Sequence, residues 1–262
     1  MKIKANLFFK SFILAFVIFS LISGVIITSL YIDVISIEPN SKETTVLLGI
    51  TDKDSLLSLM VLNFKPQENR VTYVPIPDNT FTEDKDTIQE SFNGDFSSIE
   101  NDIEDLIGTQ IDRYVLFSVD ALSDLTDNVG DFYFHIKVKF HSYEGPNNMN
   151  GELTKLMFEY QGYDMSKTSI SDIATDYFTS FMSQHGNNDS KDKLINSLSS
   201  KTFYDLINTD LSKEEMREYA ILLSKYSSFT IKRLEIVGQI EKTSSEVFFR
   251  PNDFKVKENI FK

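Results

Sequence analysis

Short apolar runs separated by polar turns fill the chain between residues 43 and 76. Glu43 to Ile50 and Leu56 to Phe64 are apolar runs of strand length, and the second ends in the polar turn Lys65 to Asn69. Val71 to Ile76 forms the next run. Apolar runs this short, bounded by turn residues, favour strands over helices. The pattern predicts a hairpin preceded by one further strand.

The periodicity then changes to that of a helix. Ile99, Ile103, Leu106 and Ile107 follow helical spacing, and Gly108 marks the end of the predicted helix. Two more strands are predicted after it, at 113–118 and 131–140. The second of these alternates strictly between apolar and polar residues, which predicts a strand with one face in a core and one in solvent. Its apolar face comprises Phe132, Phe134, Ile136, Val138 and Phe140.

The last third of the chain has helical patterns and a strong helix start. Ser212 and Glu215 form a predicted capping box, and Leu211 and Met216 flank it as a hydrophobic staple. Phe229 to Val237 predicts a closing strand before a polar tail. Strands alternating with helices in this way predict an α/β fold, with a mixed central β-sheet flanked by helices on both faces.

A long apolar segment stands apart from these short runs. The 22 residues from Ser11 to Ile32 carry no charge, which is enough to cross about 30 Å of hydrocarbon as a helix. Lysines precede the segment and Asp33 follows it, so the positive-inside rule places its amino end in the cytoplasm. The alternative is a cleavable signal peptide, whose apolar core is shorter and ends in a small-residue cleavage site. The predicted organisation is a cytoplasmic tail (1–10), a transmembrane anchor (11–32), a linker (33–43) and an extracellular domain (44–262).

Composition narrows the classes of function. The chain has 26 basic and 39 acidic residues, a net charge of −13, which argues against a nucleic-acid-binding surface. It has no cysteine, so disulfides, thiolate metal sites and cysteine nucleophiles are excluded. The three histidines lack ligand spacing and favour surface or half-buried roles over metal binding. Asp52 and Asp54 at the end of a predicted strand are candidate Mg²⁺ ligands.

The order of these segments resembles the LytR/CpsA/Psr (LCP) family, membrane-anchored proteins of the bacterial envelope. Leu47 to Thr80 is similar to the family's opening block, in which a strand ending in Leu-Leu-Gly leads through further strands to Ser-Ile-Pro-Arg-Asp-Thr. The resemblance spans about residues 44 to 240. It continues through the blocks 99–114, 119–138 and 207–238.

The resemblance implies an activity and a location. Family members move a glycopolymer from a polyprenyl-pyrophosphate carrier to peptidoglycan, with Mg²⁺ on the pyrophosphate and several arginines clamping it. It therefore implies a single-pass protein of the bacterial cytoplasmic membrane, with Mg²⁺ at Asp54. Implied partners are the membrane through residues 11–32, and a cell-wall glycopolymer, a polyprenyl lipid or an envelope protein. The substrate-pocket positions carried over are Asp54, Asp78, Asn79, Thr80, Gly162 and Asp164.

The sequence departs from the family where the arginines are expected. The Ile-Pro-Arg-Asp-Thr motif becomes Ile76-Pro-Asp-Asn-Thr80, and the Tyr-Val-Arg-x-Arg motif becomes Tyr160-Gln-Gly-Tyr-Asp164. The family's Arg-x-x-Arg-Gln helix start corresponds approximately to Ser171–Asp176. The chain's five arginines fall outside these motifs, and we expect each to be a surface charge. They are Arg70, Arg113, Arg217, Arg233 and Arg250.

Two main hypotheses follow. In the first, the chain is a degenerate family member, a pseudoenzyme that binds or scaffolds partners, because acidic residues replace the cations that a pyrophosphate requires. An acidic cleft of this kind favours Ca²⁺ or a cationic partner. The alternative is an active transferase that uses Asp54-bound Mg²⁺ and lysines in place of arginines, and a sensor or receptor module is a third class. The lysines near the aligned motifs are Lys53, Lys155 and Lys167. A deep apolar tunnel for a polyprenyl tail would favour the transferase.

Overall fold

The computed structural model describes most of the chain after residue 41. The described ranges are 42–53, 55–77, 79–83, 86–164, 168–187, 189–243, 246–256 and 258–262. The predicted cytoplasmic tail and anchor, and most of the linker, lie outside the described residues. None of the helices in the described ranges is both long and apolar enough to cross a membrane. Ser41–Lys262 form one compact unit.

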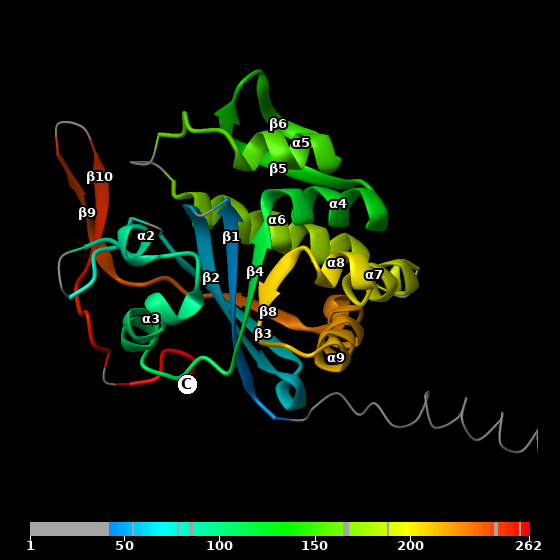
Figure 1. Ribbon diagram of the computed structural model, residues 1–262, viewed down its shortest axis with the longest axis horizontal. Coiled ribbons are helices and arrows are strands. Elements are labelled where there is room, and N and C mark those ends of the chain that lie inside the picture. Colours follow the sequence, from blue (N-terminus) through cyan, green and yellow to red (C-terminus); the bar gives the residue numbers. More distant parts are fainter. Residues whose placement is uncertain are drawn as a thin grey trace, which may run out of the picture. The chain divides into compact units, whose positions relative to one another are not determined.

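A six-stranded mixed sheet organises this unit (Figure 1). Its strands lie in the order β7-β4-β1-β2-β3-β8. The pairs β1–β2, β2–β3 and β4–β7 are antiparallel, whereas β1–β4 and β3–β8 are parallel. The predicted hairpin is therefore confirmed, with Leu62 opposite Tyr73. The strand bounds are β1 Thr44–Asp52, β2 Ser55–Lys65, β3 Arg70–Ile76, β4 Arg113–Ser118, β7 Ile207–Thr209 and β8 Thr230–Arg233.

Both faces of the sheet are covered by helices, as predicted. Figure 1 shows α2 and α3 on one face and the layer containing α6 and α9 on the other. This explains why β2 is apolar at most positions, with Ser58 and Asn63 as buried exceptions, because a strand buried on both faces has no polar face to alternate with. The bounds are α2 Ile88–Ser91, α3 Glu100–Ile107, α4 Val119–Val129, α5 Gly151–Phe158, α6 Ile170–His185, α7 Lys191–Leu198, α8 Lys201–Tyr204 and α9 Lys213–Leu223.

The alternating strand lies outside the central sheet. β5 (Phe132–Phe140) pairs antiparallel with β6 (Tyr143–Met149) in a separate two-stranded sheet. Phe132, Phe134 and Ile136 are buried, at 2–4% exposed, in the larger core between the sheet and α6. The predicted inward face is thus confirmed. Alternation identifies which residues face a core, but it does not identify the neighbouring strand.

Two helix ends predicted from local signals are confirmed. Ser212 caps α9 and Glu215 completes the capping box. The hydrogen bond from the Ser212 main chain, aided by Arg113, lowers the pKa of Glu215 to about 2. α3 ends at Gly108, whose φ of 65° is a left-handed conformation that glycine adopts without strain.

The carboxyl-terminal region differs from its prediction. The expected strand from Phe229 to Val237 ends at Arg233, because Leu234 and Ile236 turn to pack against the core on the α2–α3 side. The expected polar tail instead contains a hairpin, with β9 (Gly238–Lys242) paired antiparallel to β10 (Val247–Pro251). This hairpin stands at the left of Figure 1.

Candidate functional site

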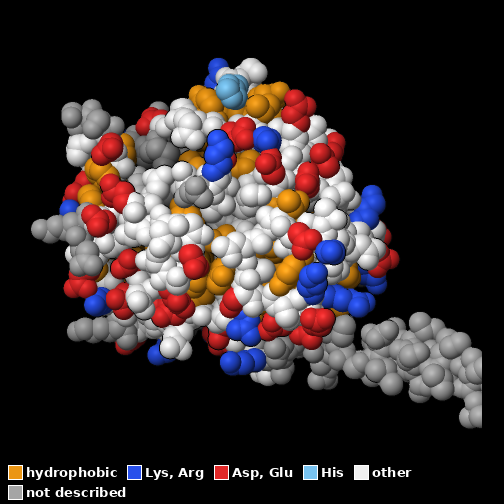
Figure 2. Space-filling view, in the orientation of Figure 1, with side chains coloured by type: hydrophobic (Ala, Val, Ile, Leu, Met, Phe, Trp, Pro, Cys, Tyr) orange, Lys and Arg blue, Asp and Glu red, His pale blue; other side chains and the backbone are white. Residues whose placement is uncertain are grey.

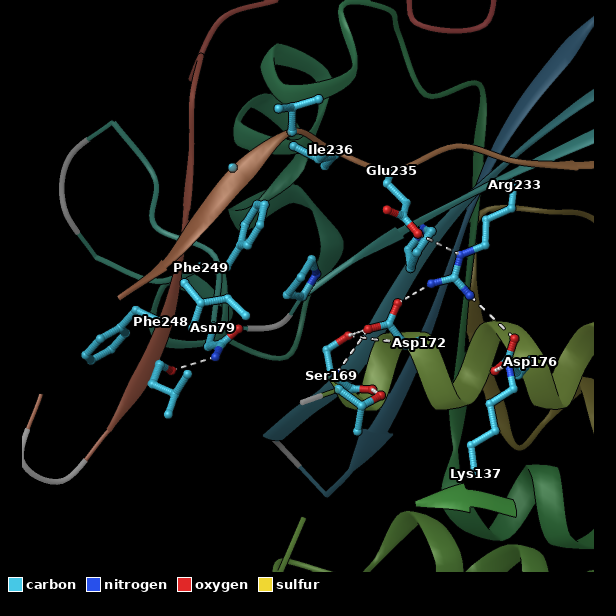
Figure 3. A pocket seen from close by; sticks show the side chains of 17 residues that line it. Asn79, Lys137, Ser169, Asp172, Asp176, Arg233, Glu235, Ile236, Phe248 and Phe249 are labelled. Atoms are coloured by element: carbon cyan, nitrogen blue, oxygen red, sulfur yellow. Dashed lines mark hydrogen bonds and ion pairs between the residues drawn. The ribbon is translucent and has the colours of Figure 1, made fainter. Parts of the chain in front are cut away.

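A pocket of about 630 Å³ lies where β3 ends, α6 begins and the chain passes from β8 to the β9–β10 hairpin. One wall is apolar and is formed mainly by the hairpin and its approach, including Ile236, Phe248 and Phe249. The opposite wall carries charged side chains from β5, α6 and the end of β8 (Figure 3). We call this the charged pocket. It contains residues from two of the aligned family motifs, the Ile76–Thr80 block and the Ser171–Asp176 block.

Its charged wall is a connected ion-pair network. The Arg233 guanidinium is paired with the Asp172 carboxylate. Its nitrogens also lie 3.4 Å from a carboxylate oxygen of Asp176 and 3.6 Å from one of Glu235. Lys137 lies 2.6 Å from the second carboxylate oxygen of Asp176. Figure 3 shows Arg233 reaching from the end of β8 towards the two α6 carboxylates. Asp172 also accepts hydrogen bonds from the main chain and hydroxyl of Ser169, completing the capping box of α6.

The basic side chains that a bound anion would need are already paired with carboxylates in this network. Among the described residues lining the pocket, two cations face three carboxylates, a net charge of −1. Each cation already contacts at least one carboxylate oxygen. A pyrophosphate would have to compete with these carboxylates for the cations while being repelled by them. The pocket is therefore poorly suited to a polyanion.

The described residues of the Ile76–Thr80 block help to anchor the hairpin. The amide of Asn79 donates to the Val247 carbonyl at 2.6 Å, and its main-chain carbonyl accepts from the Phe249 N–H at 3.1 Å. Thr80 is completely buried, and its hydroxyl donates to the Pro77 carbonyl at 2.5 Å. Of these two predicted pocket residues, Asn79 lines the charged pocket and Thr80 does not. Asp78 lies outside the described residues.

The candidate Mg²⁺ ligands are not assembled into a site by the part of the chain that the structure describes. Asp54 lies outside it. Asp52 is the partly buried last residue of β1, opposite Ser55, and does not line the charged pocket. No group of three or more His, Asp or Glu side chains in the described ranges is arranged to hold a metal ion. The Mg²⁺ site at Asp54 therefore stays a prediction.

The second aligned motif also lies away from the pocket lining. Gly162 and Asp164 are exposed and do not line the charged pocket. A Cβ added at Gly162 would lie 2.6 Å from the Tyr160 ring, so an arginine there would displace that ring. Lys155 binds Asp120 on α4 at 2.6 Å, and Lys53 is exposed at the β1–β2 turn. Lys167 lies outside the described residues.

One arginine lines the pocket, and three others pair elsewhere. Arg70 binds Glu68, Arg113 binds Glu215, and Arg250 binds Glu241. Arg233 is the last residue of β8; it is exposed, as expected of a surface charge, and it also lines the pocket. Sequence reasoning missed Arg233 and Lys137. The available signal was the pair of acids at 172 and 176, which share a helix face and require cations from elsewhere.

A second, apolar cavity lies between the sheet and helices α6 and α9. Its volume is about 80 Å³, and Leu48, Phe64, Phe181 and Tyr219 are among the side chains that line it. By comparison, an engineered apolar cavity of about 150 Å³ binds one benzene molecule. A polyprenyl chain would therefore have to displace core side chains to enter this cavity.

His185 is a buried side chain at the end of α6. The ring packs against Phe181, with centroids 4.9 Å apart, and against Phe132 at 6.3 Å. Within the described part of the chain, neither ring nitrogen has a hydrogen-bond partner of normal geometry. Burial lowers the pKa of His185 below 6.5, against a smaller opposing effect of the Gly130 main chain, and the nearby Lys193 charge lowers it further. His185 is thus a core residue and not a candidate ligand.

We expect this histidine to make folding pH-dependent. The unfolded chain takes up a proton near pH 6.5 while the folded state resists it, so stability is full above that pH and falls as the pH drops below it. In urea titrations at several pH values, His185→Phe should flatten this dependence between about pH 7 and 5. The exposed-site control His135→Gln should leave it unchanged. A wild-type slope retained in His185→Phe would contradict the assignment.

Comparisons with known proteins identify the fold. No protein-family model matches the chain, and no curated protein sequence matches it significantly. Solved structures do match, and the chain has the LCP fold, as the resemblance implied. Bacillus subtilis TagV, an LCP protein, aligns with a TM-score of 0.68 and 17% identity, covering 81% of this chain and 92% of TagV.

Two further structures show the same likeness. TagT, also an LCP protein and solved bound to LI-WTA, aligns with a TM-score of 0.61 and 13% identity over 83% of this chain and 87% of TagT. Lin1025 from Listeria innocua aligns with a TM-score of 0.58 and 20% identity over 80% and 93% of the two chains. At these identities the likeness establishes the fold, and function has to be argued from the site.

Proposed function

We propose that this chain is a membrane-anchored LCP-like protein of the bacterial cell envelope that binds or organises partners and does not transfer a glycopolymer. The observation that carries this proposal is the ion-pair network of the charged pocket. Asp172 and Asp176 stand approximately where the family has arginines, and they hold Arg233 and Lys137. Transfer from a pyrophosphate carrier needs unopposed cations at the departing phosphates. The apolar cavity of about 80 Å³ supports the same proposal, because a polyprenyl chain would have to displace core side chains to enter it.

A transfer assay tests it directly. Full-length chain in detergent is mixed with Mg²⁺, peptidoglycan and LI-WTA, the ligand of the structural neighbour TagT. We expect transfer no greater than in a mixture without protein, and TagT is assayed in the same mixture for comparison. Mg²⁺-dependent transfer that Asp54→Ala abolishes would establish the active transferase instead.

The proposed location rests on the amino-terminal sequence. The uncharged segment 11–32, preceded by lysines, predicts a single-pass anchor with residues 1–10 in the cytoplasm and the main domain outside. Protease added to intact cells should therefore digest the main domain and leave a cytoplasmic marker protein intact. A main domain that is protected until the cells are lysed would overturn this topology.

A further inference from the structure

A further pocket lies where α3 and β4 begin and β7 ends. Its volume is about 210 Å³, and none of the residues that line it lines the charged pocket. Three carboxylates line it, from three separate parts of the chain. Asp95 precedes the short 3-10 helix Phe96–Ser98, Glu100 begins α3, and Asp210 follows β7. We call it the acidic pocket.

The basic side chain that lines the acidic pocket is already bound. Arg113 binds Glu215 at 2.8 Å and donates to the main-chain carbonyl of Asp112 at 2.8 Å. Its nearest approach to the Asp210 carboxylate is 4.0 Å. Within the described part of the chain, the partly buried Glu100 carboxylate has no hydrogen-bond or ion-pair partner. The pocket therefore has negative charge that the described residues do not neutralise.

Two aromatic rings also line the acidic pocket. Phe96 and Tyr114 have ring centroids 5.0 Å apart. Burial raises the pKa of the Tyr114 hydroxyl, and the charges of Asp95, Asp210 and Glu100 raise it further, so all three carboxylates act on the space around this ring. No three acidic or histidine side chains in the described ranges are close enough together to hold a metal ion. Because aromatic faces attract cations, the pocket suits an organic cation better than a metal ion.

The surface around the acidic pocket favours a basic partner. Residues 86–112 contain eight acidic and no basic residues. Figure 2 shows acidic side chains gathered over α2 and α3, at the left of the view, with few basic ones among them. A surface of one charge sign raises the local concentration of molecules of the opposite sign and speeds their association. The occupant of the acidic pocket is therefore expected to be positively charged.

We propose that the acidic pocket binds a primary alkylammonium group, the side-chain end of a lysine that a basic partner protein presents. The carboxylates come from three separate elements, and an ammonium group directs its three donors to different sides, whereas the donors of a guanidinium lie in one plane. A volume of about 210 Å³ is below the roughly 300 Å³ at which pockets for whole small molecules begin, so the pocket admits one side chain. This binding does not depend on whether the charged pocket takes part in transfer.

Two main-chain N–H groups can report on the pocket carboxylates. The Tyr114 N–H donates to Asp210 at 2.9 Å, and the Ser97 N–H donates to Asp95 at 3.3 Å. The probe is Nα-acetyl-lysine N-methylamide, a lysine side chain on an uncharged main chain, titrated into isotope-labelled full-length chain in detergent. We expect both amide NMR signals to shift with one dissociation constant, on the order of 1 mM, and the binding to weaken as salt is added. The Nε-acetylated probe, which lacks the charge, should not shift them.

A pair of matched variants locates the binding. Glu100→Gln should weaken the binding of the lysine probe about tenfold, and unchanged amide signals elsewhere would show that the fold is retained. The control is Glu152→Gln, which removes an exposed carboxylate from the first turn of α5, another eight-residue helix, outside the pocket. Equal weakening by the two variants would overturn the proposal. So would unshifted Tyr114 and Ser97 signals, or tighter binding of the neutral probe or of the corresponding arginine derivative.

Discussion

Replacing Phe132 with alanine is expected to lower the free energy of unfolding by about 3–5 kcal/mol. The side chain is 2% exposed and lies edge-on to Tyr177 and Phe181, with centroid distances of 5.0 and 5.3 Å. It joins β5 to α6, so its loss leaves a cavity between the two-stranded sheet and the helix that supports the charged pocket. Urea unfolding followed by tyrosine fluorescence measures the change, since the chain has no tryptophan.

The neighbouring residue provides the control. Tyr133 points away from the core on the same strand and is 58% exposed. Tyr133→Ala should change the free energy of unfolding by no more than about 0.5 kcal/mol. Similar losses in the two variants would mean that β5 does not bury the face that its alternation predicts.

The sequence predicted the elements whose signals are local. The runs that became β1, β2 and β3 are bounded by polar turns, and the Ser212–Glu215 capping box is complete within four residues. The hairpin β9–β10 was missed because neither strand alternates: Phe248 and Phe249 are adjacent and only partly buried, and β9 has a single large apolar residue, Ile240, which is exposed. The 229–237 segment has a strand-like pattern throughout, yet Leu234 and Ile236 are drawn into the α2–α3 side core after Arg233. Tertiary packing therefore ended a strand that local pattern would have continued.

The candidate site was predictable only where its signal is local in the sequence. The exchange of family arginines for acids was visible in the aligned motifs. The partner of those acids was not, because Arg233 is 57 residues from Asp176 and 61 from Asp172 in sequence. Only the fold brings β8 beside the start of α6. Similarly, no sequence pattern indicated that Asn79 and Thr80 would be used to hold a hairpin.

Removing the pocket carboxylates should convert the charged pocket into an anion site. In Asp176→Asn, Lys137 loses its described carboxylate partner and Arg233 loses one of three. The double variant Asp172→Asn, Asp176→Asn leaves two cations facing Glu235 alone among the described lining charges. With partial screening, each removed charge should strengthen pyrophosphate binding on the order of tenfold. Titration calorimetry with inorganic pyrophosphate measures this, and the gain should shrink as salt is added.

A charge-matched control distinguishes the pocket from the whole molecule. Asp120 pairs with Lys155 and does not line the pocket, so Asp120→Asn changes the net charge equally without freeing Arg233. We expect Asp120→Asn to leave pyrophosphate affinity close to that of the wild type, because the charge that it removes lies outside the pocket and is screened by salt. An equal gain in pyrophosphate affinity from Asp120→Asn and Asp176→Asn would show that the α6 carboxylates do not act by neutralising the pocket cations. Wild-type chain that binds pyrophosphate as tightly as the double variant would show that the ion-pair network does not block anions. It would also remove the main support for the proposal that the chain does not transfer a glycopolymer.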